Sequence, residues 1–329
     1  MERKGIALAG NILTDNVKMV GAYPEKGMLS TITEESLAVG GCVPNTAIDI
    51  IKVDPEMSVF AYGRVGDDDK GKFVLNEMKK VGIDVSGVKI STTAPTSYSD
   101  VITVSGTGER TFFHNRGANK EFNPSDVDLD KVTAKMLHAG YVMLLDAFDK
   151  LDGDTTPMAE FLKNAQSKGI KTSIDLVSET SGSFHKIATA SLPYCDYVII
   201  NEIEAGAIVN EEVRDKDGAL IDENVKIAMQ KLMKYGVKEK VIIHCPEKGF
   251  CLDKTGKITV VNSLKLPKGF IKGSVGAGDA FCAGSLYAIY HEYSDEEILS
   301  FANLVAISCL TEKDSVSGIK RKEELKNLL

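Results

Sequence analysis

The sequence lacks the cysteine patterns that mark disulfide-stapled and metal-binding proteins. Its 329 residues include six cysteines, with no Cys-x-x-Cys pair and no histidine near them at metal-ligand spacing. In a chain of this length, such cysteines are typical of buried apolar residues in a reducing compartment. The five histidines are scattered in the same way. We therefore expect free, buried thiols and no histidine-based metal site.

Positive charge is also in short supply. The chain has 39 Lys and Arg against 47 Asp and Glu, a net charge of −8, and nothing in that balance suggests a basic surface for nucleic acid or an anionic membrane. The apolar run near the N-terminus is too short for a signal peptide or a membrane span. We expect a cytoplasmic protein that binds neither nucleic acid nor membrane and holds any anionic ligand by local dipoles.

Two enzyme signatures are missing as well. No Gly-x-Gly-x-x-Gly follows the first expected strand, and no Gly-x-Ser-x-Gly occurs, so a dinucleotide-binding oxidoreductase and a serine hydrolase have no support. Residues 66–72 nearly match a phosphate-binding P-loop, but Phe73 stands where Ser or Thr would bind magnesium. We interpret that segment as a solvated turn before a helix.

What the chain does contain is an alternation of short apolar runs with amphipathic helical segments. Expected strands cover 5–10, 57–62, 170–176, 197–200 and 240–245, and expected helices cover 72–81, 157–167 and 224–235. Strands separated by such helices predict parallel βαβ units, and hence an α/β fold whose mostly parallel sheet is covered on both faces. No repeat or linker interrupts the pattern, so we expect one domain over residues 1–329.

One part of the chain departs from this alternation. Residues 96–104 and 109–116 alternate in the manner of strands on either side of a Ser-Gly-Thr-Gly turn, which predicts a hairpin. Residues 17–39 also lack a helical period. We expect a small β-sheet, built from about 13–39 and 95–118, that covers the carboxyl ends of the main strands as a lid. A simple edge hairpin is the alternative.

The most informative motif is Lys272-Gly-Ser-Val-Gly-Ala-Gly-Asp279, which runs directly into apolar helical sequence. Glycines allow consecutive backbone N–H groups to point the same way, and such a nest at a helix N-terminus binds anions. Asp279 would repel a phosphate there, but it makes sense if it takes a proton from a hydroxyl that attacks the phosphate. An ordinary first-turn aspartate, favoured by the helix dipole, is the alternative.

Two further motifs carry polar groups at the starts of helices. Gly40-Gly41-Cys-Val-Pro-Asn45 precedes an expected helix at 46–53, and Asn45 offers a donor and an acceptor to hydroxyls or acts as a helix cap. Asn201-Glu-Ile-Glu204 follows an expected strand, where α/β sheets bind ligands. Glu204 there could orient water around a magnesium ion, or belong to a solvated helix start.

In this order and spacing, the three motifs resemble those of the ribokinase-like (PfkB) carbohydrate kinases, over essentially the whole chain. Further collinear matches are Gly10 with Asp15, Gly66-Asp67, Gly117-Ala-Asn119 and Lys248-Gly249. The resemblance implies a three-layer α/β/α fold with a β lid, and a homodimer formed through that lid. It also implies transfer of the γ-phosphoryl group of MgATP to a hydroxyl of a small carbohydrate, as in fructokinases and ribokinases.

The resemblance implies roles for individual residues. Asp279 would be the catalytic base, and the amides of Gly276, Ala277 and Gly278, with that of Asp279 itself, would form the anion hole. The implied sugar contacts are Asp15, Gly41, Asn45 and Asp146; the implied nucleotide contacts are Asn201, Lys248, Gly249 and Asn303; and Glu204 would lie by the magnesium ion. Gly273 replaces an acid that helps several relatives to bind a monovalent cation, so we expect little activation by potassium.

The acceptor remains open at this stage. Arg110, Phe112, His114 and Arg116 fall on one face of the expected hairpin strand, at a period of two. If that face covers the site, its arginines could bind a carboxylate or a phosphate, which makes Arg110 a candidate substrate contact. If it faces solvent or a partner lid, a neutral hexose or pentose remains the expectation, with a nucleoside next. A sugar-binding protein without catalytic activity is the alternative of a different class.

Overall fold

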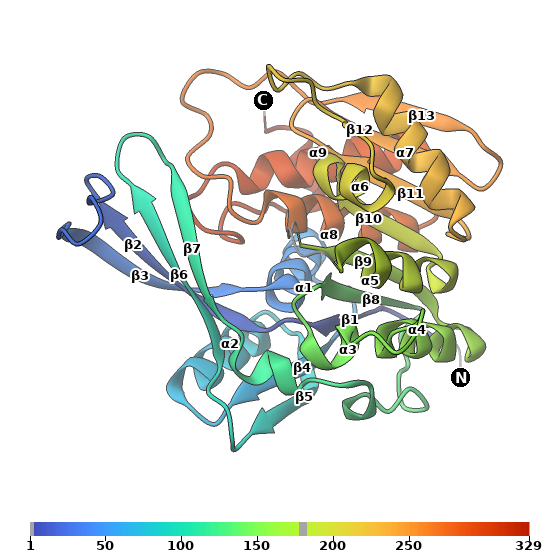
Figure 1. Ribbon diagram of the computed structural model, residues 1–329, viewed down its shortest axis with the longest axis horizontal. Coiled ribbons are helices and arrows are strands. Elements are labelled where there is room, and N and C mark those ends of the chain that lie inside the picture. The colour runs from blue at the N-terminus through green and yellow to red at the C-terminus, as the bar shows by residue number, and fades with distance from the viewer. Residues whose placement is uncertain (1–2, 178–182, 329) are drawn as a thin grey trace.

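The computed structural model describes residues 3–177 and 183–328, and its centre is a nine-stranded sheet (Figure 1). In spatial order the strands are β13 (Ile258–Asn262), β12 (Lys248–Asp253), β11 (Lys240–His244), β10 (Tyr197–Asn201), β9 (Lys171–Leu176), β8 (Met136–Val142), β1 (Ile6–Gly10), β4 (Val59–Gly66) and β5 (Asp84–Ser91). From β5 to β11 all neighbours are parallel, whereas β12 and β13 add an antiparallel edge. The expected mostly parallel sheet is confirmed.

The central strand β1 shows why the sheet is covered on both sides. All five of its residues are buried, as expected for a parallel strand between two helical layers. Ala7 and Ala9 pack into one hydrophobic core, and Ile6 and Leu8 pack into the other. Because successive side chains of a strand point to opposite faces, one short apolar run supplies both cores.

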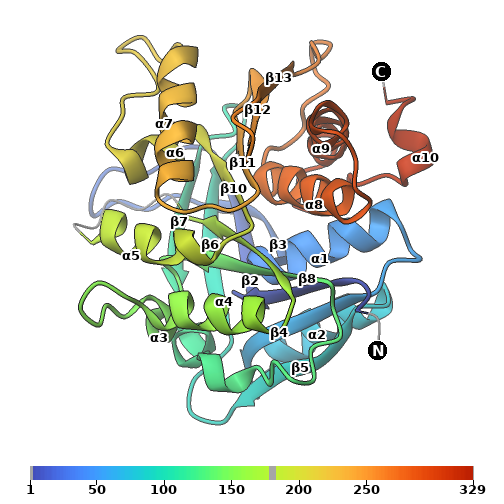
Figure 2. The same ribbon diagram turned by 90° about the vertical axis from the view of Figure 1, so that its right-hand side faces the viewer.

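The helices form two layers, one on each face of the sheet (Figure 2). One layer contains α1 (Cys42–Val53), α2 (Asp69–Lys80), α8 (Ala277–Tyr290), α9 (Asp295–Cys309) and the short α10 (Lys322–Leu325). The other contains α3 (Asp146–Asp149), α4 (Pro157–Ser167), α5 (Phe184–Ser191), α6 (Glu202–Val209) and α7 (Asp222–Lys234). The three-layer α/β/α architecture is therefore confirmed, and α4 has the predicted bounds.

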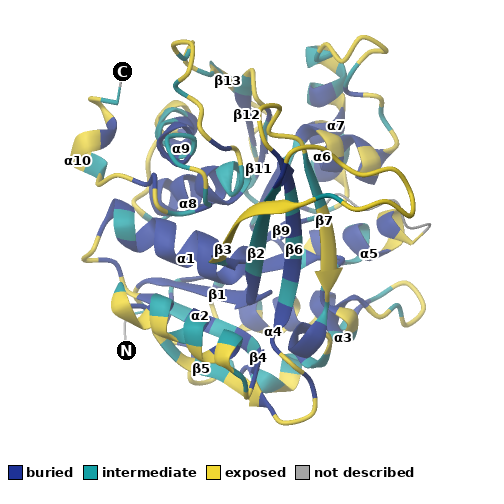
Figure 3. Cartoon of the chain, turned by 90° about the vertical axis from the view of Figure 1, so that its left-hand side faces the viewer, coloured by how far each residue is buried: buried dark blue, intermediate teal, exposed yellow. Residues whose placement is uncertain are grey.

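A second, four-stranded sheet projects from the main body in Figure 1 and faces the viewer in Figure 3. Its order is β3 (Ile32–Gly40), β2 (Leu13–Val20), β6 (Ser97–Val104) and β7 (Arg110–Asn115). The hairpin predicted at 96–116 is β6 and β7, and the segment at 17–39 contributes strands as expected. In this small sheet, the central strands are largely covered and much of the edge strands β3 and β7 is exposed.

Two expectations from composition can be compared with the structure. All six cysteines are buried and carry free thiols, as predicted. Within residues 3–177 and 183–328, no helix has the length and apolar character needed to cross a membrane.

Candidate active site

Asp279 lies in the first turn of α8, and its side chain opens on a cavity of about 870 Å³ beneath the small sheet. We call this space the central cavity; Asp15, Gly41, Asn45, Tyr141, Asn201 and Asp279 are among the residues that line it. Tyr141 and Asn201 lie at the carboxyl ends of β8 and β10, where ligands bind in open α/β sheets. Residues expected at the site therefore lie at the edge of the sheet where the topology predicts ligand binding. Asp279 is only 8% exposed, but it faces this cavity.

The glycine nest before α8 has the geometry of an anion site. Gly276 caps the helix with φ of 78°, and a Cβ there would lie 2.5 Å from the Cβ of Ser315, so only glycine fits. The amide of Ala277 makes a long bond of 3.4 Å to the carbonyl of Ser274. The amides of Gly278 and Asp279 have no acceptor in the described part of the chain. These donors, together with the helix dipole, can stabilise negative charge in front of α8.

The carboxylate of Asp279 is held by two side chains. Asn45 Nδ2 donates to Oδ2 at 2.9 Å, and the hydroxyl of Tyr141 donates to Oδ1 at 2.6 Å. Burial raises the pKa of Asp279, and these two hydrogen bonds oppose that rise. Ser315 Oγ in turn donates to Asn45 Oδ1 at 2.9 Å, which fixes the Asn45 amide with its NH₂ toward Asp279. Sequence reasoning identified Asn45 but missed Tyr141 and Ser315, because neither belongs to a motif.

Asp15 and Gly41 approach the same cavity from the other side. Asp15 lies on β2, and burial, followed by the nearby charge of Asp279, raises its pKa to about 7. Gly41 caps α1 with φ of 92°, and a Cβ there would lie 2.7 Å from the carbonyl oxygen of Asn11. This close approach brings the start of α1, and with it Asn45, to the end of β1. Two carboxyl groups and an amide therefore surround a space suited to hydroxyl groups.

The Asn201 motif forms a helix cap beside a cluster of acids. Asn201 Oδ1 accepts from the amide of Glu204, and a Glu204 carboxylate oxygen accepts from the amide of Asn201, which is a capping box. Asp175, near the end of β9, is buried, and its pKa is raised by burial and by the charges of Glu204 and Asp279. Carboxylate oxygens are ligands that Mg²⁺ prefers, so Asp175 joins Glu204 as a candidate magnesium ligand. Sequence reasoning missed Asp175, whose signal was its place at the end of an expected strand.

Three predicted nucleotide contacts lie away from the central cavity. Lys248, at the start of β12, forms an ion pair of 2.7 Å with Asp222, and Gly249 is buried beside Leu299. Asn303 lies on α9, which packs against β12. Its Nδ2 is buried without a hydrogen-bond partner in the described part of the chain. None of the three lines the central cavity.

Three of the four residues predicted to share one face of the hairpin strand line the central cavity, and the fourth does not. Arg110 lines the central cavity together with Phe112 and His114, so the period-two expectation holds for these three. It is wrong for Arg116, because β7 ends at Asn115. Arg116 instead donates to Asp146 at 2.6 Å and to the carbonyl of Met143 at 3.2 Å.

The implied sugar contact Asp146 is therefore engaged elsewhere. Its carboxylate forms the ion pair with Arg116, its side chain is 50% exposed, and it is not among the residues that line the central cavity.

Comparison with known proteins agrees with this arrangement. The chain matches the family described as pfkB family carbohydrate kinase over residues 6–321. It is 26% identical to a ribokinase of Schizosaccharomyces pombe, over 95% of this chain and 94% of that protein. It is 27% identical to probable fructokinase-5 of Arabidopsis thaliana, over 89% of this chain and 88% of that protein.

The fold is shared with solved structures. Arabidopsis thaliana ribokinase complexed with ribose and ATP superimposes with a TM-score of 0.82 at 20% identity, covering 99% of this chain and 98% of that one. Ribokinase from Thermotoga maritima superimposes with a TM-score of 0.79 at 20% identity, covering 99% of each chain. The family match spans nearly all of the chain, which therefore belongs to the pfkB family of carbohydrate kinases, phosphotransferases that act on a hydroxyl group.

Proposed function

We propose that this chain transfers the γ-phosphoryl group of MgATP to a hydroxyl of a small carbohydrate. The observation that carries the proposal is the position of Asp279, whose carboxylate faces the central cavity from a helix start where two amides have no acceptor among the described residues. An acceptor hydroxyl in that cavity can meet both a base and an anion site. The match to a ribokinase solved with ribose and ATP supports these two ligands.

The reaction requires little covalent chemistry from the protein. The acceptor oxygen forms a bond to the γ-phosphorus, the bond from that phosphorus to the bridging oxygen of ADP breaks, and Asp279 takes the hydroxyl proton. Phosphoryl transfer passes through a loose transition state, so positioning and charge stabilisation matter more than the strength of the base. The amides of Gly278 and Asp279 and the dipole of α8 supply that stabilisation.

We assign the magnesium and nucleotide contacts to the residues that the family resemblance implies, with Asp175 added to them. Asp175 and Glu204 would hold Mg²⁺, directly or through water, since the charges of both Glu204 and Asp279 act on the carboxyl group of Asp175 and raise its pKa. The ion, when bound, neutralises charge on the phosphates of ATP. We expect Asn201, Lys248 and Gly249 to contact the nucleotide. The unpartnered amide of Asn303 supports a contact with its base.

The acceptor-binding groups follow from the same cavity. Asp15, Gly41 and Asn45 would bind hydroxyls, and Arg110 would contact the acceptor from β7. Asp146 is a weaker candidate because Arg116 occupies its carboxylate.

We also propose a homodimer formed through the small sheet. Met28 and Leu29, in the loop between β2 and β3, are 71% and 86% exposed, and Leu37 and Phe113 are exposed on its edge strands. Such apolar exposure is typical of an interface. Light scattering at micromolar concentration should give twice the chain mass, and L29D should give the monomer mass with unchanged circular dichroism. A monomeric wild type would contradict this assembly.

The buried free thiols are in keeping with a reducing cytoplasm.

The test of the function is a coupled ADP-release screen over pentoses, hexoses, sugar acids, sugar phosphates and nucleosides. We expect one acceptor class to give turnover, and Asp279→Asn to lower kcat by roughly 10²–10⁴-fold while calorimetry shows nearly intact binding of acceptor and ATP. Asp130→Asn, in an exposed ion pair with Lys168, is the matched control and should keep wild-type turnover. Near-wild-type turnover of Asp279→Asn would refute the assignment. Acceptor binding without any ADP release would indicate a non-catalytic sugar-binding protein.

A further inference from the structure

Arg110 holds an unusual position among the arginines of this chain. It lies on β7, on the face of the small sheet that carries Asp15 and the other cavity-lining residues. Its side chain is half-buried, and burial lowers its pKa. A guanidinium nevertheless remains charged in proteins, so this position places a permanent positive charge inside the cavity.

No acid in the described part of the chain neutralises that charge. Arg64, Arg116 and Arg214, which are also half-buried, each form an ion pair with a carboxylate. The side chain of Arg110 forms neither a hydrogen bond nor an ion pair within residues 3–177 and 183–328. A charge that is partly removed from water without a partner is costly, and a bound anion would offset that cost.

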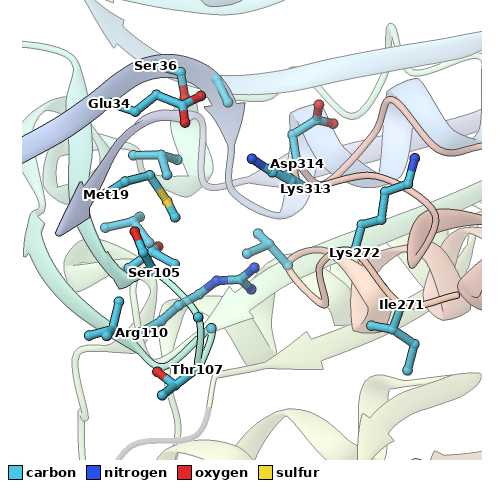
Figure 4. A pocket seen from close by; sticks show the side chains of 18 residues that line it. Met19, Glu34, Ser36, Ser105, Thr107, Arg110, Ile271, Lys272, Lys313 and Asp314 are labelled. Atoms are coloured by element: carbon cyan, nitrogen blue, oxygen red, sulfur yellow. The ribbon is translucent and has the colours of Figure 1, made fainter. Parts of the chain in front are cut away.

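The Arg110 side chain lies where two cavities meet. A second space of about 670 Å³, which we call the lateral cavity, adjoins the central cavity at Gly108, Arg110 and Val275, which line both. Figure 4 shows the Arg110 side chain extending from β7 into this lateral cavity. Its guanidinium is therefore directed into open space rather than against the protein surface.

The acids that line the lateral cavity are otherwise placed. Glu34 lies on β3, three strands from β7, which is about 14 Å at the usual strand spacing. Asp314 already accepts from the amides of Val316 and Ser317. Lys313 also lines this cavity and adds positive charge, whereas Lys272 is paired with Glu312 at 3.3 Å. Neither acid of the lateral cavity pairs with Arg110, which leaves its charge available to an anion.

We infer that the acceptor carries an anionic group, a carboxylate or a phosphate monoester, that pairs with Arg110 while its reacting hydroxyl lies at Asp279. This inference rests on the proposed kinase function and names its substrate class. His114 on β7 lies opposite Ser99 on β6, which in turn lies opposite Asp15 on β2. Arg110 is four residues from His114 along β7, so it lies about 14 Å along the strand direction from the level of Asp15. An extended sugar acid or sugar phosphate, together with the arginine side chain, spans that distance.

The chemistry of the pair explains why arginine is suited to this place. A guanidinium donates two parallel hydrogen bonds to a carboxylate or a phosphate, and such charge-assisted bonds are stronger than bonds to neutral hydroxyls. A neutral sugar would leave Arg110 unpaired. Arg110 would therefore determine specificity for the acceptor and take no part in the phosphoryl transfer itself.

The experiment compares matched acceptors by ADP release. The pairs are D-glucose with D-gluconate, D-fructose with D-fructose 6-phosphate, and D-ribose with D-ribose 5-phosphate, assayed with wild type, Arg110→Ala, Arg110→Lys and the exposed control Arg321→Ala. We expect wild type to favour an anionic member, and Arg110→Ala to lower kcat/KM for that acceptor about 10–100-fold, mainly through KM. Arg110→Lys should retain part of the preference, and Arg321→Ala all of it.

A binding measurement without nucleotide separates recognition from turnover. The accepted anion alone should raise the Tm of wild type and raise that of Arg110→Ala much less. Preference for gluconate or for a sugar phosphate would identify a carboxylate or a phosphate as the partner of Arg110. The inference would be overturned if neutral sugars were turned over faster than their anionic partners and Arg110→Ala left that turnover unchanged. If the turnover of neutral sugars still depended on Asp279, the kinase function would stand. Absence of ADP release with every acceptor would overturn both.

Discussion

The hydroxyl of Tyr141 donates a 2.6 Å hydrogen bond to Oδ1 of Asp279, so the proposed base on α8 is held by a residue at the carboxyl end of β8. Burial raises the pKa of Tyr141 well above its ordinary value, and the charge of Asp279 adds to that rise. The phenol therefore remains protonated and remains a donor throughout the working pH range. Together with Asn45 it fixes both oxygens of the carboxylate toward the cavity.

We predict that Tyr141→Phe moves the pH dependence of kcat. The two hydrogen bonds lower the pKa of Asp279 against the effect of burial, so removal of one raises it. A hydrogen bond to a charged group contributes about 1.5–3 kcal/mol, which corresponds to a shift of roughly one to two pH units. The acidic limb of kcat, measured at saturating acceptor and ATP, should move upward by about that amount.

The matched control for this prediction is Tyr287→Phe. The Tyr287 hydroxyl donates to Asp54 at 2.9 Å, so this variant also loses a buried bond from a tyrosine to a carboxylate. Tyr287 lies eight residues beyond Asp279 on α8, about 12 Å along the helix. Removal of the Tyr287 hydroxyl should lower the Tm but leave the pH dependence of kcat unchanged. An equal shift in both variants would show that the effect is not specific to Asp279.

The sequence predicted the parts of the site that depend on local motifs. The nest before Asp279, the glycine turn before Asn45 and the helix at Pro157–Ser167 each have a local physical cause, a glycine or a helical period, that is visible in one segment. The sequence also predicted most of the parallel strands, because buried strands are short continuous apolar runs.

The contacts that orient the base could not be predicted in this way. Tyr141 and Ser315 are brought to Asp279 and Asn45 by tertiary packing, across 138 and 270 residues of chain. The strand β8, which carries Tyr141, was not predicted, since His138 and Gly140 interrupt its apolar run. Arg116 fits the period-two pattern of the sequence, but β7 ends before it and its side chain pairs with Asp146.

We predict that Ser315→Ala lowers kcat about 10-fold. Ser315 fixes the orientation of the Asn45 amide, and without it the amide can rotate so that its oxygen, not its NH₂, faces Asp279. The control is Ser308→Ala, which loses the bond of 2.6 Å from Ser308 Oγ to the carbonyl of Gly318. Both variants should lose similar stability, but only Ser315→Ala should lose turnover, with KM for ATP unchanged. Equal kcat values in the two variants would contradict the role given to Ser315.

We predict that Asp15→Asn stabilises the protein more at pH 8 than at pH 5. The folded protein holds a proton on Asp15 up to about pH 7, whereas the unfolded chain releases it near pH 4. Stability is therefore lost as pH rises between these values, and asparagine, which resembles the protonated acid, avoids the loss. The Tm difference between variant and wild type should grow by roughly 2 °C per pH unit and level off above pH 7.

The control for Asp15 lies on the same small sheet. Asp100 on β6 pairs with Lys18, and that contact lowers its pKa. Its contribution has the opposite sign, because the charged form is favoured in the folded state. Asp100→Asn should therefore lower Tm at pH 8 and have less effect as the pH falls through the lowered pKa. A Tm difference for Asp15→Asn that does not change with pH would contradict the raised pKa.

The last prediction concerns monovalent cations. Gly273 offers no carboxylate, and a Cβ there would lie 2.7 Å from the carbonyl oxygen of Glu312 and 2.9 Å from Cα of Lys313. The backbone of 312–313 therefore occupies the space that an acidic side chain would need. We expect turnover to change little between equal concentrations of potassium, sodium and choline chloride. We also expect Gly273→Ala to cost about 1–3 kcal/mol through overpacking, while Gly21→Ala, which meets no atom within 4 Å, has little effect. A several-fold rise in kcat with potassium alone would show that backbone carbonyls bind the ion without that acid.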